Sequence, residues 1–295
     1  MSAFAKLLPT LFKDPPPKYA FELSEAGVSF TTFDSARQVK FAPLEPGVIS
    51  TSPVRDNIQM PDALDARIRS IAPPNGNRKR RAALILPDYS ARVAVLDFDS
   101  FPSDHDEQVA LVRFRMKKSV PFDIDSAIVS YHAQPAVNGK IEIVVAVMAF
   151  EIIARYEAPF RQAAFHPGFI TTSALAALNL LKPDKVTLLA KLSGRTLSVL
   201  VLDGSILKLA RCMEMEEGTT AEIEAILHPT FIYVEVEMQS KANRLLLCGF
   251  GPEAQDLSQR WHAEWGVSVE TLQSRFGMPG PNDAGLLGYL ESLES

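Results

Sequence analysis

The sequence is poor in cysteine, with two in 295 residues. A disulfide scaffold needs many paired cysteines, so this count excludes that class and fits a reducing compartment. A basic excess is missing as well, because 30 Lys and Arg stand against 35 Asp and Glu, for a net charge of −5. Proteins that bind free nucleic acid ordinarily carry such an excess, and no nucleic-acid partner is expected.

Long hydrophobic runs are also lacking. The longest clean apolar stretch is Ile143–Phe150, which is the length of a strand and far below the ~18 residues of a membrane-spanning helix. The N-terminal sequence does not resemble a signal peptide, because no basic leader precedes its apolar part, Pro9 interrupts it and no small-residue cleavage site follows. We therefore expect neither a membrane span nor a secretion signal.

The N-terminal tail, residues 1–17, ends in three consecutive prolines. Its apolar residues have the spacing of one helical face: Phe4, Leu7, Leu8, Leu11 and Phe12. Two interpretations remain open. The tail either packs or frays as an ordinary terminus, or serves as a short foot on a membrane surface or a partner.

Recognisable catalytic and metal-binding motifs are absent. The five histidines have no metal-ligand spacing, and Cys212 and Cys248 lie in apolar strand contexts that favour a core role. No phosphate-binding loop, nucleophile elbow or dinucleotide fingerprint occurs. No catalytic residue and no metal ligand is therefore predicted.

The turn Gly249-Phe250-Gly251 is the one suggestive element. It follows the buried strand 244–248 and precedes a helix, so its glycines would let a ligand approach the backbone and the helix start would offer free N–H groups. A tight strand–helix turn without a ligand explains the pattern equally well.

Hydrophobic residues make up 47% of the chain, enough for a sizeable core. A three-stranded meander is predicted over residues 18–41, with its third strand at 37–41, and a second over residues 186–210. Two meanders, each followed by helices, indicate two related α/β halves. The expected division of the chain is a tail and three units: 1–17, 18–81, 82–165 and 166–295.

The unit 82–165 has a different pattern of strand, helix, strand and strand. An acidic start at Asp104 opens a helix that runs to Ser119, and two strands joined by the Asn138-Gly139 turn follow it. A trailing helix over 151–164 is predicted to be kinked or split by Pro159. In the third unit, Pro229 is predicted to divide residues 219–239 into two helices.

Three segments carry a resemblance to a known family: Leu84–Pro87, Ser119–Asp125 and Val129–Tyr131. With the order of elements, they resemble the PilM-like family of type IV pilus assembly proteins, which are related to FtsA. The resemblance covers about residues 18–290. It implies an actin-like, ribonuclease H-like fold of two lobes, with an inserted strand–helix–strand–strand subdomain.

The sequence departs from an actin-like ATPase at both phosphate loops. In the first loop, Glu22–Gly27 replaces the Asp-x-Gly pattern, and Glu25 would face the phosphates. In the second loop, Lys191–Ser193 replaces the Asp-x-Gly pattern, so its aspartate is missing. Residues 215–244 have room for about two helices, so the outer subdomain of the second lobe is expected to be reduced. Hydrolysis and Mg-ATP binding are therefore not expected, and only Gly249 and Gly251 remain as adenosine-side contacts.

The resemblance implies a non-catalytic cytoplasmic scaffold at the inner face of the bacterial inner membrane. Its partner would be the cytoplasmic tail of a PilN-like inner-membrane protein, with a pilus motor ATPase and a second copy of the chain as further partners. The expected groove lies beside the helix 104–119, with these candidate contacts: Arg113, Phe114, Lys117, Pro121 and Phe122. For Phe114, Pro121 and Phe122, plain core packing is an equally open interpretation.

Two alternative functions remain. One is the cytoplasmic arm of a type II secretion system, similar to GspL, which normally continues into a membrane span. The other is a nucleotide-binding actin-like ATPase, which requires acids at both phosphate loops. Binding of a partner peptide, without binding of ATP, would favour the scaffold over the ATPase.

Overall fold

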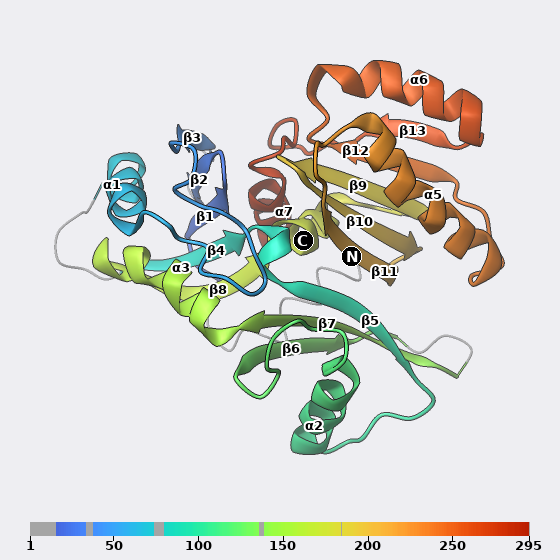
Figure 1. Ribbon diagram of the computed structural model, residues 1–295, viewed down its shortest axis with the longest axis horizontal. Helices are drawn as coiled ribbons and strands as arrows, with labels where there is room; N and C mark the ends of the chain where they lie inside the picture. Colours follow the sequence, from blue (N-terminus) through green and yellow to red (C-terminus); the bar gives the residue numbers. More distant parts are fainter. Residues whose placement is uncertain (1–15, 34–37, 74–79, 136–138, 184, 295) are drawn as a thin grey trace.

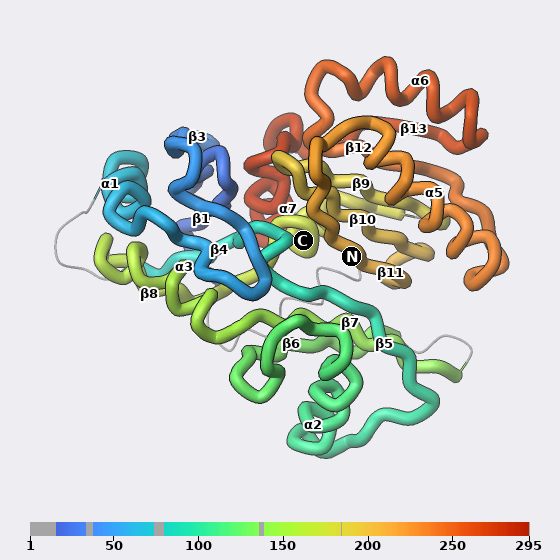
Figure 2. The backbone as a smooth tube through the Cα atoms, viewed as in Figure 1, coloured from blue at the N-terminus to red at the C-terminus, as the bar shows by residue number. Residues whose placement is uncertain are grey.

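The computed structural model describes residues 16–33, 38–73, 80–135, 139–183 and 185–294. The chain folds into two lobes, each built on a five-stranded sheet, and a smaller three-stranded sheet lies below them (Figure 1). In the backbone trace the first lobe is blue and cyan, with α3 and β8 in yellow-green, and the second lobe is yellow and orange (Figure 2).

The first sheet has the strand order β3-β2-β1-β4-β8. Neighbouring strands β1, β2 and β3 are antiparallel, whereas β4 runs parallel to β1 and β8 runs parallel to β4. Helices α1 and α3 contribute to one apolar core with this sheet. The bounds are β1 (Tyr19–Ser24), β2 (Gly27–Thr32), β3 (Lys40–Pro43), α1 (Pro61–Ile71), β4 (Arg80–Leu86), α3 (Phe150–Gln162) and β8 (Phe165–Thr172).

The second sheet repeats this arrangement in the order β11-β10-β9-β12-β13. Again three antiparallel strands form a meander, and β12 and β13 run parallel to its first strand, β9. Helices α5 and α6 share its core. The bounds are β9 (Thr187–Ser193), β10 (Thr196–Asp203), β11 (Ile206–Glu214), α5 (Thr220–Val236), β12 (Arg244–Cys248), η5 (Gly251–Glu253), α6 (Ala254–Trp265) and β13 (Ser268–Thr271).

The two related halves predicted from the repeated meander are therefore confirmed at the level of strand order. The expected boundary at residue 166 needs correction, because β8 pairs with β4 and belongs to the first sheet. A run of apolar and β-branched residues identifies a strand but not the strand with which it pairs. The prediction from the sequence therefore placed β8 in the wrong half. The first strand of the second sheet begins at Thr187.

The third sheet is the inserted unit, with the order β5-β7-β6 and antiparallel pairing throughout. Helix α2 covers one of its faces, and Asp104 begins that helix by accepting hydrogen bonds from two backbone N–H groups, each at 3.0 Å. The bounds are η3 (Asp88–Ser90), β5 (Arg92–Phe98), α2 (His105–Met116), β6 (Ala127–Ala133) and β7 (Ile141–Ala149). The predicted turn residue Asn138 and the start of the predicted strand 37–41 lie outside the described residues.

Helices α4 (Ser173–Ala177) and α7 (Ala284–Leu293) lie against each other between the two large sheets, with η4 (Leu178–Leu180) following α4 (Figure 1). Their contact requires Gly288, because a Cβ atom there would lie 2.1 Å from the carbonyl oxygen of Ala176. The close approach lets both helices reach the cleft between the lobes at their N-terminal ends.

The predicted division of a helix at Pro229 is wrong, and so is the predicted split at Pro159, whereas the alternative of a kink at Pro159 stays a prediction. Helix α3 continues through Pro159, and α5 continues as one helix through Pro229. A proline removes one backbone donor and ordinarily breaks a helix. In α5 the Thr230 hydroxyl donates to the Ile226 carbonyl oxygen at 3.2 Å, and the helix buries Ile223, Leu227 and Val234, which offsets the missing bond. One helix therefore replaces the two expected between β11 and β12.

Candidate functional site

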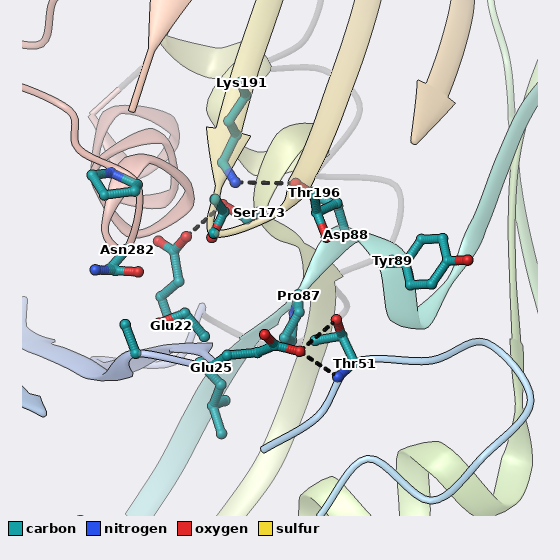
Figure 3. A pocket seen from close by; sticks show the side chains of 16 residues that line it. Glu22, Glu25, Thr51, Pro87, Asp88, Tyr89, Ser173, Lys191, Thr196 and Asn282 are labelled. Atoms are coloured by element: carbon teal, nitrogen blue, oxygen red, sulfur yellow. Dashed lines mark hydrogen bonds and ion pairs between the residues drawn. The ribbon is translucent and has the colours of Figure 1, made fainter. Parts of the chain in front are cut away.

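The cleft between the lobes is filled by side chains of the chain itself (Figure 3). It is bounded by the β1–β2 turn, the loop after β4 and the start of α4 on one side, and by β9, the β9–β10 turn and the loop before α7 on the other. The cavity that remains has a volume of about 50 Å³. Small-molecule sites usually measure ~300–1,000 Å³, and a water molecule needs ~10–15 Å³, so the space suits a few waters rather than a nucleoside triphosphate.

Glu22, on β1, lies at the bottom of this cleft and is 1% exposed. Its carboxylate accepts a hydrogen bond from the Ser173 hydroxyl, at the start of α4, and another of 2.6 Å from the backbone N–H of Leu286, in the first turn of α7. The N-terminal end of a helix favours a negative charge, so the carboxylate occupies a position suited to an anion. Burial raises the pKa of Glu22 to about 7, although the charge of Lys191 and these hydrogen bonds act to lower it.

Asp88, just after β4, connects the first lobe to the second. Its Oδ2 atom accepts from the Lys191 ammonium and from the Ser198 hydroxyl, each at 3.0 Å, and its Oδ1 atom accepts from the Ala174 N–H at 2.6 Å. Lys191 and Ser198 face each other on β9 and β10. This group of contacts therefore joins the first lobe, the start of α4 and the second lobe.

The Lys191 side chain is 2% exposed. Burial disfavours its charged form, but the neighbouring carboxylates of Asp88 and Glu22 outweigh that effect and hold the pKa of Lys191 above its ordinary value. The ammonium is therefore charged and already paired. The structure shows the residue that replaces the acid of the second phosphate loop bound to Asp88.

Glu25 lines the cleft but turns toward Thr51 (Figure 3). Its Oε1 atom accepts from the Thr51 N–H at 2.7 Å and from the Thr51 hydroxyl at 2.9 Å. The sequence predicted that Glu25 would face the phosphates of a nucleotide, and in the structure its Oε1 atom is bound to Thr51 at the edge of the cleft. Its hydrogen-bonding partner comes from the loop before α1, which sequence reasoning did not identify.

Gly249 and Gly251, the predicted adenosine-side contacts, form the turn after β12 and are not among the described residues that line the cleft cavity. Gly249 has φ of +83°, and a Cβ atom there would lie 2.0 Å from the carbonyl oxygen of Leu192. Packing against the β9 end therefore accounts for this glycine without a ligand. Gly251 has φ of +58° with open space beside it. A ligand contact at this turn stays a prediction.

A second hollow, which we call the groove, lies between the third sheet and the first lobe and has a volume of about 400 Å³. Strands β6 and β7 form one wall, while α3, β8, α4 and Tyr289 of α7 form the other. Most of its lining is apolar, including Val144, Met148, Leu175 and Leu178. Its volume and lining are those of a binding site for apolar groups.

Two edge strands line the groove. Strand β6 is the outer strand of the third sheet, and β8 is the outer strand of the first. Residues 169–172 of β8 and residues 128–132 of β6 are in the lining, with the single exception of Val129. An edge strand carries backbone N–H and C=O groups that an added strand can pair with. The groove therefore suits an extended peptide, which would combine main-chain hydrogen bonds with apolar pockets.

The five predicted partner contacts are described by the structure, but the groove lining includes none of them. They lie at the end of α2, on the opposite face of the third sheet (Figure 1). Arg113 donates to the backbone carbonyls of Ile124 and Ala127, and Phe122 packs against the α2 core, so both have structural partners. Phe114 is 75% exposed, and Lys117 and Pro121 are exposed as well.

Sequence reasoning missed the position of the groove, although a signal was present. Residues alternate along a strand, so Ile128, Ser130 and His132 of β6 share the face opposite to that of Val129. Val129 packs with the α2 core, whereas the other three line the groove. The alternation was visible in the sequence, but which face meets the first lobe depends on tertiary packing.

Other kinds of site have little support in the described part of the chain. Among those residues, no group of three His, Cys, Asp or Glu side chains is placed to hold a metal ion. None of the helices described there has the length and apolar character needed to cross a membrane.

Two sheets of the same strand order, with two packed helices and a cleft between them, define the actin-like fold. A similar solved structure is the "PilM-PilN type IV pilus biogenesis complex", with a TM-score of 0.72 and 16% identity over 96% of this chain and 100% of that chain. The expected actin-like fold with an inserted subdomain is thereby confirmed.

Two further structures share the fold. One is a Bacteroides thetaiotaomicron protein with an actin-like ATPase fold and unknown function, with a TM-score of 0.57 and 12% identity over 98% of both chains. The other is the cytoplasmic domain of EpsL, an inner-membrane component of the type II secretion system of Vibrio cholerae, with a TM-score of 0.53 and 12% identity over 94% of both chains. No protein-family model and no curated protein sequence matches the chain.

Proposed function

We propose that this chain is a non-catalytic adaptor of a type IV pilus assembly machine, and that its groove holds the cytoplasmic tail of a PilN-like inner-membrane protein. The observation that carries the proposal is the pairing of a closed cleft with an open groove. The cleft leaves about 50 Å³, whereas the groove offers about 400 Å³ of mostly apolar space lined in part by two edge strands.

The resemblance in fold to the PilM–PilN complex supports the choice of partner. A tail peptide that binds in an extended form uses apolar pockets and the backbone of an edge strand, and the groove has mostly apolar walls that include the edge strands β6 and β8. In such a complex the adaptor would lie at the inner face of the membrane because its partner is anchored there. The five residues at the end of α2 remain the sequence-based prediction for contacts with the partner's tail, and they lie outside the groove lining.

The charged groups in the cleft argue against a working ATPase. An acid that positions a metal-bound water is replaced by Lys191, and the ammonium is already bound to Asp88. The carboxylates of Glu22 and Asp88 accept hydrogen bonds from backbone N–H groups at the starts of α7 and α4. A triphosphate would have to displace these carboxylates and bear their repulsion.

The experiment is calorimetry on the full chain with two ligands. The first is a synthetic peptide that copies the cytoplasmic tail of a PilN-like inner-membrane protein from the same organism, and the second is Mg-ATP. We expect saturable binding of the peptide and no heat of binding with Mg-ATP. Saturable ATP binding, or a melting temperature that rises with ATP concentration, would overturn the pseudo-ATPase claim, because a ligand of the native state raises apparent stability.

A peptide that gives no saturable heat at concentrations of about 1 mM would overturn the adaptor claim. In that case the interaction free energy would be weaker than ~4 kcal/mol. A scrambled peptide of the same composition is the control, since it keeps the charge and hydrophobicity but not the order of the side chains.

A further inference from the structure

The described part of the chain begins beside the groove. The carbonyl oxygen of Pro17 accepts a hydrogen bond of 2.8 Å from the Tyr289 hydroxyl, and Pro17 is buried whereas Pro16 is exposed. The Tyr289 ring lines the groove and stacks on Phe169, another lining residue, with 5.7 Å between ring centroids. Pro17 therefore contacts a groove-lining side chain, and residues 1–15 are joined to the described chain one residue before it.

Residues 1–15 have the reach and composition to occupy this groove. A fully extended chain spans ~3.3 Å per residue, so fifteen residues reach up to about 50 Å from their point of attachment. Five large apolar side chains fall within nine residues of this segment: Phe4, Leu7, Leu8, Leu11 and Phe12.

The groove exposes apolar surface that would gain from a cover. Ile128 and Phe150 both line it, and their exposed fractions are 47% and 57%. Large apolar side chains at one open hollow are costly in water, and apolar surface of this kind ordinarily marks an interaction site. The groove walls are apolar, so the ligand they fit is an apolar segment rather than a charged one.

We propose that the apolar side chains of the segment 1–15 bind in the groove of the same chain and compete with the partner's tail. The proposal rests on the proposed function in one respect, namely that the partner uses the same groove. A short tether gives an attached ligand an effective concentration in the millimolar range. The chain's own segment therefore outcompetes the segment of a second copy at micromolar protein concentrations.

The first test maps the position of the segment. In the Leu8→Cys variant of the full chain, the new thiol is labelled with benzophenone maleimide and the sample is illuminated. Burial raises the pKa of Cys212 and of Cys248 to about 12, so both native thiols are poor nucleophiles and the label goes to position 8. The unmodified chain, treated in the same way, measures any background labelling.

We expect cross-links within one chain to the groove walls, in residues 128–132 and 169–179. Cross-links confined to other surfaces, or none above background, would overturn the proposal. Cross-linked dimers as the main product would overturn the intramolecular form, since they place the segment in the groove of a second copy.

The second test measures competition. The partner's tail peptide is titrated into the full chain and into the full-length variant Leu7→Asp/Leu8→Asp, whose charged side chains would have to enter an apolar groove. We expect the variant to bind the partner peptide about tenfold more tightly or better, because the competing segment is removed. The control is Lys13→Asp, which changes the charge outside the apolar set.

The outcomes separate this inference from the proposed function. Equal affinity of the wild type and the double variant for the partner peptide overturns competition and leaves the adaptor function standing. Cross-links to the groove together with no binding of the partner peptide by either protein support the intramolecular segment and overturn the adaptor function.

Discussion

The Lys191 ammonium lies 3.0 Å from the Asp88 carboxylate, and this buried pair connects the two lobes across the cleft. The exposed fractions of the two side chains are 2% and 6%. Because both charges are removed from water, each depends on the other for compensation. The pair therefore fixes the lobes relative to each other without a ligand.

Removing one partner of this pair is expected to destabilise the fold. The Lys191→Met variant leaves the Asp88 carboxylate buried without its counter-charge, and we expect a loss of about 3–5 kcal/mol in the free energy of unfolding. Chemical denaturation measures this loss.

The double variant Asp88→Asn/Lys191→Met tests the cause. It removes both charges, so we expect it to recover part of the stability, with a coupling energy that shows in a double-mutant cycle. The control is Lys140→Met, which breaks the Lys140–Asp97 pair, whose side chains are 62% and 63% exposed. We expect the control substitution to change the free energy of unfolding only slightly. Additive losses at Asp88 and Lys191 would contradict the proposed coupling.

Glu22 is expected to make stability depend on pH. Its pKa in the folded chain is raised from 4.5 to about 7, chiefly by burial. Between these values the folded chain keeps a proton that the unfolded chain releases, so the unfolding free energy decreases as pH rises through this window. The decrease attributable to Glu22 is at most roughly 3 kcal/mol.

The Glu22→Gln variant separates this effect from the other titrating groups. Glutamine keeps the shape of the side chain and an acceptor oxygen but does not titrate. We expect the difference in unfolding free energy between wild type and variant to change steadily between about pH 4.5 and about pH 7. A difference that stays constant across this window would show that Glu22 does not retain its proton on folding.

Strand patterns determined what the sequence could predict. Apolar runs separated by turn residues gave both meanders and the inserted hairpin, because alternation and turn chemistry are local. The partner of β8 and the path of α5 through Pro229 depended on tertiary contacts. Local propensity favours a break at Pro229, but burial of the surrounding helix outweighs it.

The cleft was predictable only in part. Glu22, Glu25 and Lys191 follow from the positions of the two meander turns, so their place near the cleft could be read from the sequence. Asp88 carried no such signal, because it lies in a short turn after β4 and its partner Lys191 is 103 residues away. The sequence analysis expected a groove beside the helix 104–119 but did not predict the position of this one, since its walls come from segments distant in sequence.

The partner's tail is expected to distinguish the groove from the end of α2. We expect Ile128→Asp to weaken binding of the tail peptide at least tenfold, because the charge would be buried in an apolar groove. We expect Phe114→Asp to leave the affinity unchanged, although its side chain is the more exposed of the two, at 75% against 47%. Calorimetry with the full chain measures both affinities.

Both positions are partly exposed apolar side chains, so each variant serves as the control for the other. The opposite result, in which the Phe114 variant loses affinity for the tail peptide and the Ile128 variant does not, would show that the peptide binds at the end of α2. That surface holds the five residues predicted from the sequence. Unfolding curves of the two variants would show whether either loss has a structural origin.

The contact between α4 and α7 is expected to be sensitive to one methyl group. In the Gly288→Ala variant the new Cβ atom would meet the Ala176 carbonyl oxygen at 2.1 Å, and rigid backbone on both sides limits relief. Alanine raises helix propensity by ~1 kcal/mol over glycine, so an exposed site would become more stable. Here we expect overpacking to lower the free energy of unfolding by about 1–3 kcal/mol, measured by chemical denaturation.

The same substitution should affect the groove, because Ala176 and Tyr289, next to Gly288, both line it. Separation of α7 from α4 would move the Tyr289 ring, so we expect weaker binding of the tail peptide as well as lower stability. Ser292→Ala, in the last turn of the same helix, is the control, since its hydroxyl bonds only the Tyr289 carbonyl oxygen among the described contacts. An unchanged or higher stability of Gly288→Ala would show that the helices separate freely, and the groove wall would then not depend on their close approach.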